Sequence, residues 1–220
     1  MVNNFTNLTK IQFNLYKRSW INSSRLGFTV DENNLPIPWY AFEAIEFLKI
    51  NLTKNHTIFE FGCGASTLFF ASKVKKVISL ESNRRWFEII TSILKNSGDF
   101  LLEKNYFSNA NCEIFLMEDA LNLEEYQNFA QNYSQKNNIK FDFLIVDSLK
   151  RYECAKNSFE AIKSDGYLIL DDSERPNYQK IFDFLQKNNF SYQDFIGIAP
   201  AQLRIKKTRS SWRFKMAICL

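Results

Sequence analysis

Histidine is almost absent from this 220-residue sequence, in which His56 is the only one. A catalytic triad with histidine as the base, or a metal site rich in histidine, is therefore not expected. The four cysteines are far apart and form no CxxC pair: Cys63, Cys112, Cys154 and Cys219. Since no export signal accompanies them, we expect reduced thiols.

Long apolar runs are also missing. No stretch reaches the ~18 apolar residues that are needed to span a bilayer. The first residues, MVNNFTNLTK, lack the charged-then-apolar pattern of a signal peptide. We therefore expect a cytoplasmic protein without a transmembrane segment. The net charge of +4 is modest, and basic residues are mixed with acidic ones, so nucleic acid is not expected as a partner on this ground.

What the sequence does contain is a regular alternation of apolar runs and amphipathic stretches. Strands are expected at 57–61, 76–81, 112–117, 141–147 and 167–171, with two more near 192–198 and 211–219. Helices are expected at 39–52, 66–74, 84–96, 152–163 and 177–189, and in part of 122–138. In 84–96 the side facing the sheet would carry Trp86, Ile89, Ile90, Ile93 and Leu94. This alternation predicts an α/β fold with a doubly wound, Rossmann-like sheet.

The first 35 residues differ from the rest, because they are polar and irregular with scattered aromatic residues. We expect an N-terminal arm or cap over residues 1–35 and one domain over residues 36–220, with Pro36 and Pro38 at the boundary.

Acidic residues follow the predicted strands, near the point where each strand ends. Ligands of doubly wound sheets bind beyond the carboxyl ends of the strands. Any one of these acids could instead cap a helix or lie in a loop, but together they favour a site. They are Glu60, Glu81, Asp119, Asp147, Asp171 and Asp172.

A glycine turn follows the first strand, with Gly62 and Gly64 before a helix that opens near Ser66. Glycine lets a ligand approach the backbone, and a helix N-terminus favours a negative group. The dinucleotide fingerprint would need a third glycine where this chain has Thr67, so NAD fits poorly. Glu81 ends the second strand, where an acid accepts hydrogen bonds from ribose hydroxyls. An adenosine-type ligand is therefore expected.

Five segments in order resemble the motifs of the class I S-adenosylmethionine-dependent methyltransferases: EFGCGAS, VISLES, MEDAL, FDFLIVDS and DGYLILDDS. The resemblance covers roughly residues 57–175. PIPWYAFEAIEFL is also similar to the leading helix of a bacterial subgroup of methyltransferases. The resemblance implies a seven-stranded, mostly parallel sheet with its last strand antiparallel and helices on both faces.

The same resemblance implies S-adenosylmethionine as cofactor and assigns residues to it. Glu60 would lie near the methionine end, Glu81 would bind the ribose and Asp119 the adenine edge. Ser66 takes the place of the usual third small residue of the first motif. The implied cofactor-binding residues are Glu60, Gly62, Cys63, Gly64, Ser66, Glu81, Ser82, Asp119, Ala120 and Asp147.

The catalytic candidates are Asp147, Asp171 and Arg151. Transfer to a hydroxyl needs a group that removes a proton, and the two acids are suited to that. Arg151 could pair with Asp147 or Asp171, or bind an anionic substrate group. Some O-methyltransferases of this fold hold Mg²⁺ on acids equivalent to Asp147, Asp171 and Asp172. Those enzymes have asparagine at the place of Asp172, so Mg²⁺ is not favoured here.

The segment 204–215, RIKKTRSSWRFK, is rich in basic residues. It could bind nucleic acid or an anionic glycolipid. The alternation of Trp212, Phe214 and Met216 favours instead a solvated hairpin that leads into the last strand.

The function expected from this resemblance is methyl transfer to a small molecule or a glycan precursor, at oxygen. Two alternatives stay open. One is a non-catalytic nucleoside- or partner-binding protein that has kept the fold. The other is an RNA methyltransferase, although VDSL stands where base-amino enzymes have an Asn/Asp-Pro-Pro-aromatic motif. A homo-oligomer is also left open.

Overall fold

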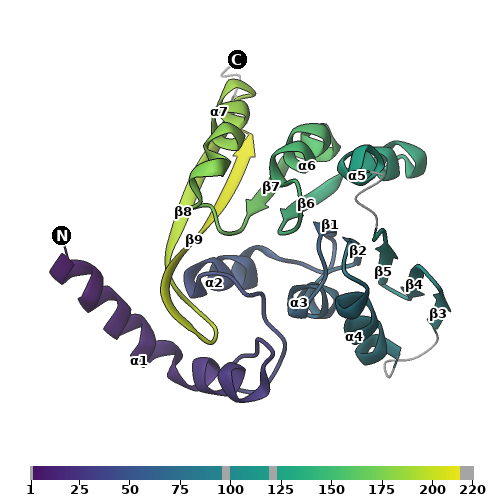
Figure 1. Ribbon diagram of the computed structural model, residues 1–220. Coiled ribbons are helices and arrows are strands. Elements are labelled where there is room, and N and C mark those ends of the chain that lie inside the picture. Colours follow the sequence, from purple (N-terminus) through teal and green to yellow (C-terminus); the bar gives the residue numbers. More distant parts are fainter. Residues whose placement is uncertain (1, 96–99, 119–122, 214–220) are drawn as a thin grey trace.

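The structure, a computed structural model, describes residues 2–95, 100–118 and 123–213. A mixed sheet of nine strands lies at its centre (Figure 1). The strands are β1 (Thr57–Phe61), β2 (Lys76–Glu81), β3 (Phe100–Glu103), β4 (Tyr106–Asn109), β5 (Cys112–Leu116), β6 (Phe141–Val146), β7 (Ile162–Leu170), β8 (Phe190–Ala199) and β9 (Gln202–Arg213). The helices are α1 (Val2–Leu26), α2 (Phe42–Asn51), α3 (Ala65–Lys73), α4 (Arg84–Lys95), α5 (Leu123–Asn137), α6 (Arg151–Ser158) and α7 (Gln179–Lys187), with short 3₁₀ helices at Phe159–Ala161 and Pro176–Tyr178.

The strand order is β3-β4-β5-β2-β1-β6-β7-β9-β8. The five central strands, from β5 to β7, are parallel, and β9 runs antiparallel to β7. The predicted α/β sheet is thus confirmed, but the predicted number of seven strands is wrong. The two additional strands are the hairpin β3–β4, which pairs with β5 at the edge of the sheet. These four-residue strands are held by backbone pairing and carry no long apolar run, so the sequence pattern gave little indication of them.

The last strand begins earlier than predicted. β9 starts at Gln202 and pairs with β8 along most of its length. The hydrophobic pattern does not reveal the beginning of β9, because several of its polar residues are buried in ion pairs instead of apolar contacts. Phe214, Met216 and the rest of the predicted strand beyond 213 lie outside the described residues.

Helices cover both faces of the sheet, as predicted. One core cluster packs α2, α3 and α4 on one face, and the other packs α5, α6 and α7 on the opposite face. Within the parts of the chain that the structure describes, no helix combines the length and apolarity needed to cross a bilayer.

The predicted inner side of α4 is wrong in part. The buried residues are Phe87, Ile90, Thr91 and Leu94. Trp86 is 40% exposed and Ile93 43% exposed. The buried stripe is therefore shifted by one residue along the helix relative to the predicted stripe. Trp86 is left exposed and can line a cavity.

The first 35 residues are not irregular. They begin with α1, a 25-residue helix with a kink at Tyr16 (φ −107°, ψ 15°). Tertiary contacts compensate for its polar composition, since Tyr16 stacks on Phe42 of α2 with ring centroids 4.2 Å apart. At its C-terminal end Ser23 Oγ donates to the carbonyl of Val30 (2.9 Å), which ties the helix to the following loop.

The side chain of Gln12 fixes α1 to β8, the edge strand of the sheet. Its Oε1 accepts a hydrogen bond from the Ile198 amide (3.0 Å), and its Nε2 donates to the Ile196 carbonyl (3.3 Å) and to Glu43 (2.7 Å). A Cβ on Gly197 would collide with the Gln12 amide. Gly197 thus leaves room for the Gln12 amide against the strand.

Candidate active site

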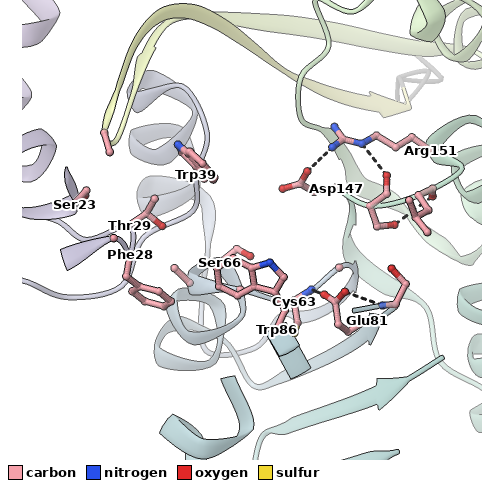
Figure 2. Close-up of a pocket in the computed structure, with 18 of the residues that line it drawn as sticks. Ser23, Phe28, Thr29, Trp39, Cys63, Ser66, Glu81, Trp86, Asp147 and Arg151 are labelled. Atoms are coloured by element: carbon pink, nitrogen blue, oxygen red, sulfur yellow. Dashed lines mark hydrogen bonds and ion pairs between the residues drawn. The ribbon is translucent and has the colours of Figure 1, made fainter. Parts of the chain in front are cut away.

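A cavity of about 790 Å³ lies at the carboxyl edge of the parallel strands. One wall comes from the β1–α3 turn, the end of β2, the start of α4 and the loop after β6. The facing wall comes from the end of α1, the loop before α2 and the β8–β9 turn (Figure 2). The residues named from the sequence that line it are Gly62, Cys63, Gly64, Ser66, Glu81, Ser82, Asp147 and Arg151.

The glycine turn is packed tightly between two strand ends. The Gly62 amide donates to the Leu80 carbonyl (2.8 Å), and the Asp147 amide donates to the Phe61 carbonyl (3.1 Å). Gly62 has φ +102°, and a Cβ there would lie 2.7 Å from the Asp147 carbonyl oxygen. Both the backbone conformation and the close approach therefore require glycine at this position.

Glu60 lies behind the turn, outside the residues that line the cavity. It is buried on the α3 side of β1 and accepts hydrogen bonds from the hydroxyls of Ser66, Thr67 and Ser79. Thr67 in turn accepts from the Gly64 amide (3.0 Å). Glu60 thus organises the start of α3, and its predicted place at the methionine end of a cofactor stays a prediction.

Burial raises the pKa of Glu60 to about 7, and the three hydroxyl donors only partly oppose this effect. A carboxyl whose pKa is higher in the folded than in the unfolded state stabilises the fold fully below pH 4.5. That stabilisation is lost as the pH rises through about 7.

We therefore expect the free energy of unfolding to fall between pH 5 and pH 8. Glu60→Gln should remove about 3 kcal/mol of this fall, because the pKa rises from 4.5 to about 7 and each unit corresponds to ~1.4 kcal/mol. Urea titrations at several pH values measure it. Glu88→Gln, on the exposed side of α4, is the control and should keep the full pH dependence. Equal pH profiles for the parent chain and Glu60→Gln would contradict the assignment.

Glu81 is nearly buried and forms part of the cavity wall. Its carboxylate accepts three backbone hydrogen bonds, from Cys63 (2.6 Å), Ser82 (2.8 Å) and Asn83 (2.6 Å). Burial raises its pKa, and these backbone donors act against the rise. The result is a fixed acceptor that joins the glycine turn to the end of β2.

Asp147 points into the cavity, and Arg151 lies behind it (Figure 2). Arg151 Nη2 is 2.7 Å from Asp147 Oδ1, and Arg151 also donates to the carbonyls of Ser148 (3.1 Å) and Asp171. The side chain of Arg151 is 8% exposed and that of Asp147 29% exposed. The predicted ion pair is therefore present, with Asp147 as the member that reaches the cavity.

Asp171 and Asp172 do not line the cavity. Lys206 Nζ lies 2.6 Å from Asp171 Oδ2 and 3.2 Å from Asp172 Oδ1, and Thr208 donates to Asp171 Oδ1 (2.9 Å). Asp172 also pairs with Arg175. Burial and the charge of Asp147 raise the pKa of Asp171 to about 7, against the opposing effect of Lys206.

This arrangement does not match the Mg²⁺ set considered from the sequence. Cationic side chains already occupy the oxygens of Asp171 and Asp172 that a metal ion would need. Across residues 2–95, 100–118 and 123–213, no three His, Cys, Asp or Glu side chains are grouped as metal ligands.

The basic segment that starts at residue 204 pairs mostly with acids of the same chain. Lys206 belongs to the buried cluster, Lys207 and Arg209 pair with Asp194, and Arg213 pairs with Glu160. The guanidinium of Arg209 lies 3.7 Å from the ring centroids of both Phe182 and Tyr192. These contacts support the hairpin interpretation of the segment.

Sequence reasoning missed the aromatic part of the cavity. Phe28, Trp39 and Trp86 line it together with Leu149. The sequence pattern assigns Trp86 to helix packing, Phe28 lies in a segment without a motif, and the segment that contains Trp39 gives no indication that this side chain lines a site. The exposed tryptophans could be found only once the helices were placed on the sheet. Two predicted adenine contacts, Asp119 and Ala120, lie outside the described residues.

No family model matches the sequence, and no curated protein matches it. Solved structures do match in fold. The O-methyltransferase TomG from Streptomyces achromogenes, involved in tomaymycin synthesis and solved with SAM, has a TM-score of 0.58 at 12% identity, over 91% of this chain and 89% of that one.

A putative O-methyltransferase from Klebsiella pneumoniae gives a TM-score of 0.56 at 13% identity, over 97% of this chain and 99% of that one. An rRNA methylase from Streptococcus thermophilus gives 0.52 at 15% identity, over 77% and 93%. The chain therefore has the fold of the class I S-adenosylmethionine-dependent methyltransferases, as the motifs predicted.

Proposed function

We propose that this chain, with its class I methyltransferase fold, transfers a methyl group from S-adenosylmethionine to an oxygen atom of a small molecule or glycan precursor. The observation that carries the proposal is Glu81. It stands at the end of β2, fixed by the glycine turn, with its carboxylate in the wall of a cavity whose volume of about 790 Å³ is typical of small-molecule and cofactor sites.

The residues present fit the cofactor. Glu81 would accept hydrogen bonds from the ribose hydroxyls, and Trp86 and Leu149 offer apolar surface for the adenine. The turn through Gly62 and Gly64 brings backbone close to the cavity. Ser82, Asp119 and Ala120 stay predicted contacts. The cofactor supplies a methyl group on a positively charged sulfur, and the carboxylates of Glu81 and Asp147 complement that charge.

Another buried polar group feels the charge of Asp147, although it does not line the cavity. Tyr40 is fully buried, and its hydroxyl has no hydrogen-bond partner among the described residues. Burial, followed by the charges of Asp147 and Glu60, raises its pKa, so it stays a donor. A buried donor without a partner costs free energy.

Asp147 is the carboxylate best placed to accept a proton from the acceptor hydroxyl. It lines the cavity, whereas Asp171 is 1% exposed and paired with Lys206. Arg151 would act as a positioning residue that orients Asp147 through their 2.7 Å contact. We also propose that residues 1–35 act as a cap over the domain 36–220, since Ser23, Phe28 and Thr29 supply cavity wall.

Calorimetry with S-adenosylmethionine and S-adenosylhomocysteine tests the proposal. Micromolar binding of both is expected. Glu81→Gln should weaken it by about tenfold or more, because a carboxylate acceptor of ribose hydroxyls is replaced by a neutral amide. Glu88→Gln should bind as the parent chain does. Failure of both compounds to bind at millimolar concentration would refute the proposal. Binding without turnover of any acceptor would favour the non-catalytic alternative.

A further inference from the structure

The charged residues that line the cavity are two acids and two cations. Glu81 and Asp147 bring acids to the glycine turn, and Arg151 and Arg175 are the cations of the lining. Arg151 is engaged, because its three nitrogens donate to Ser148, Asp171, Asp147 and Asp172 and its side chain is 8% exposed. Arg175 is therefore the cation that can meet a ligand.

Arg175 is anchored and still accessible. Its side chain is 50% exposed, and Nη2 pairs with Asp172 Oδ2. Asp172 is itself held, by Lys206 at 3.2 Å and Arg151 at 3.5 Å. Within the described residues, Asp172 is the only ion-pair or hydrogen-bond partner recorded for this guanidinium. One edge of the fork is thus fixed, and the other edge is left for an anion such as a carboxylate or a phosphate.

The cluster around Asp172 carries an excess of positive charge. Three carboxylates, Asp147, Asp171 and Asp172, face four cations: Arg151, Arg175, Arg204 and Lys206. The two cations at the surface are Arg175 and Arg204, with side chains 50% and 60% exposed. The excess charge is therefore presented to solvent and to the cavity, not to the core.

An aromatic surface is tied to the same cluster. Trp39 lines the cavity and is 45% exposed. Its carbonyl accepts a hydrogen bond from Lys206 Nζ (2.7 Å), which also lies 5.8 Å from the indole ring. Lys206 thus joins Trp39 to Asp172, the residue that orients Arg175. Phe28 adds a second ring to this side of the cavity (Figure 2).

We propose that the methyl acceptor is a small aromatic molecule that carries an anionic group, a carboxylate or a phosphate. Arg175 binds the anion, and the ring of the acceptor packs against Trp39. This inference rests on the proposed function and deepens it, because it assigns the substrate class of the same cavity.

Binding to the complex with S-adenosylhomocysteine tests the inference with three probes: 4-hydroxybenzoate, 4-hydroxyphenyl phosphate and the neutral 4-hydroxybenzamide. At least one anionic probe should have an affinity about tenfold or more above that of the amide. This is the gain expected when a charge-assisted hydrogen bond is formed. Which anion binds better decides between carboxylate and phosphate.

Arg175→Gln should reduce the affinity of the preferred anionic probe to that of the amide, with the affinity for S-adenosylhomocysteine unchanged. Arg175→Lys should give an intermediate value, since it keeps the charge but not the fork. Arg18→Gln, an exposed position on α1 away from the cavity, is the control with the same change of charge.

Two results would overturn the inference while leaving the proposed function standing. The first is equal affinity for the anionic and neutral probes, or no binding of either anion at millimolar concentration, in a chain that binds S-adenosylhomocysteine. The second is an Arg175→Gln variant that keeps its preference for the anion. Failure to bind S-adenosylhomocysteine would count against the proposed function instead.

Discussion

Lys206→Met should lower the free energy of unfolding by about 3–5 kcal/mol, the usual cost of removing one partner from a buried ion pair. The lysine is 4% exposed and is held by Asp171, Asp172 and the Trp39 carbonyl. Burial acts to lower its pKa, but attraction from Asp171 and Asp147 outweighs this and leaves the pKa raised. Methionine would fill the space but leave two buried carboxylates without their shared cation.

Urea denaturation and thermal melts measure the effect, and a fall in Tm of roughly 6–20 °C is expected for a chain of this size. The loss should shrink at pH 5, because Asp171 has a pKa of about 7 even beside the lysine and takes up a proton there. A second substitution, Asp171→Asn, should recover part of the loss in the double variant, since the amide oxygen can still accept from Thr208.

The neighbouring Lys207→Met serves as control. Its pair with Asp194 is 3.3 Å long and partly exposed, with both side chains 22% accessible. Such pairs contribute ~0–1 kcal/mol. A Lys206→Met variant no less stable than Lys207→Met would show that the cluster is not a stabilising unit.

Gly62→Ala is expected to destabilise the chain by about 2–4 kcal/mol. The positive φ of +102° is strained for any residue with a side chain, and the new Cβ would meet the Asp147 carbonyl oxygen at 2.7 Å. Relief of that clash requires movement of the loop after β6, so S-adenosylmethionine binding should weaken as well. Chemical denaturation and calorimetry on the same preparation separate the two effects.

Gly64→Ala provides a matched comparison two residues along the same turn. Gly64 has an extended backbone (φ 178°), and the nearest atom to its Cβ position is Ser66 Oγ at 3.9 Å. Alanine fits there without strain, so stability should stay within ~0.5 kcal/mol of the parent or rise slightly. A greater loss of stability in Gly64→Ala than in Gly62→Ala would contradict the roles assigned to these two glycines.

The central sheet could be predicted because its strands are buried on both faces. FDFLIVD and TIFEF are nearly unbroken apolar runs, a direct consequence of packing between two helical layers. The hairpin β3–β4 and the first part of β9 could not be predicted, for the opposite reason. They are stabilised by backbone pairing and by ion pairs such as Arg209 with Asp194, and neither leaves a clear hydrophobic pattern.

For the site, the parts tied to strand ends could be predicted and the parts contributed by distant segments could not. Glu81 and Asp147 follow β2 and β6 directly, so their convergence follows from parallel strands. The position of Glu60 behind the turn could not be predicted. Only the orientation of α3 in the structure shows that the hydroxyls of Ser66 and Thr67 reach its carboxylate. Trp39 is linked to Arg175 through Lys206 and Asp172. The bond from Lys206 to Trp39 joins residues 167 positions apart, which no local pattern encodes.

The side-chain amide of Gln12 occupies backbone groups on the outer edge of β8, the last strand of the sheet. The Gln12 amide presents its carbonyl oxygen and one N–H side by side to the strand, the same pair that the backbone of one residue in a neighbouring strand would offer. Gln12 therefore stands in for a tenth strand at Ile196 and Ile198. An edge strand of another chain could add at these two residues only after displacing it, so Gln12 protects this part of the β8 edge from strand addition.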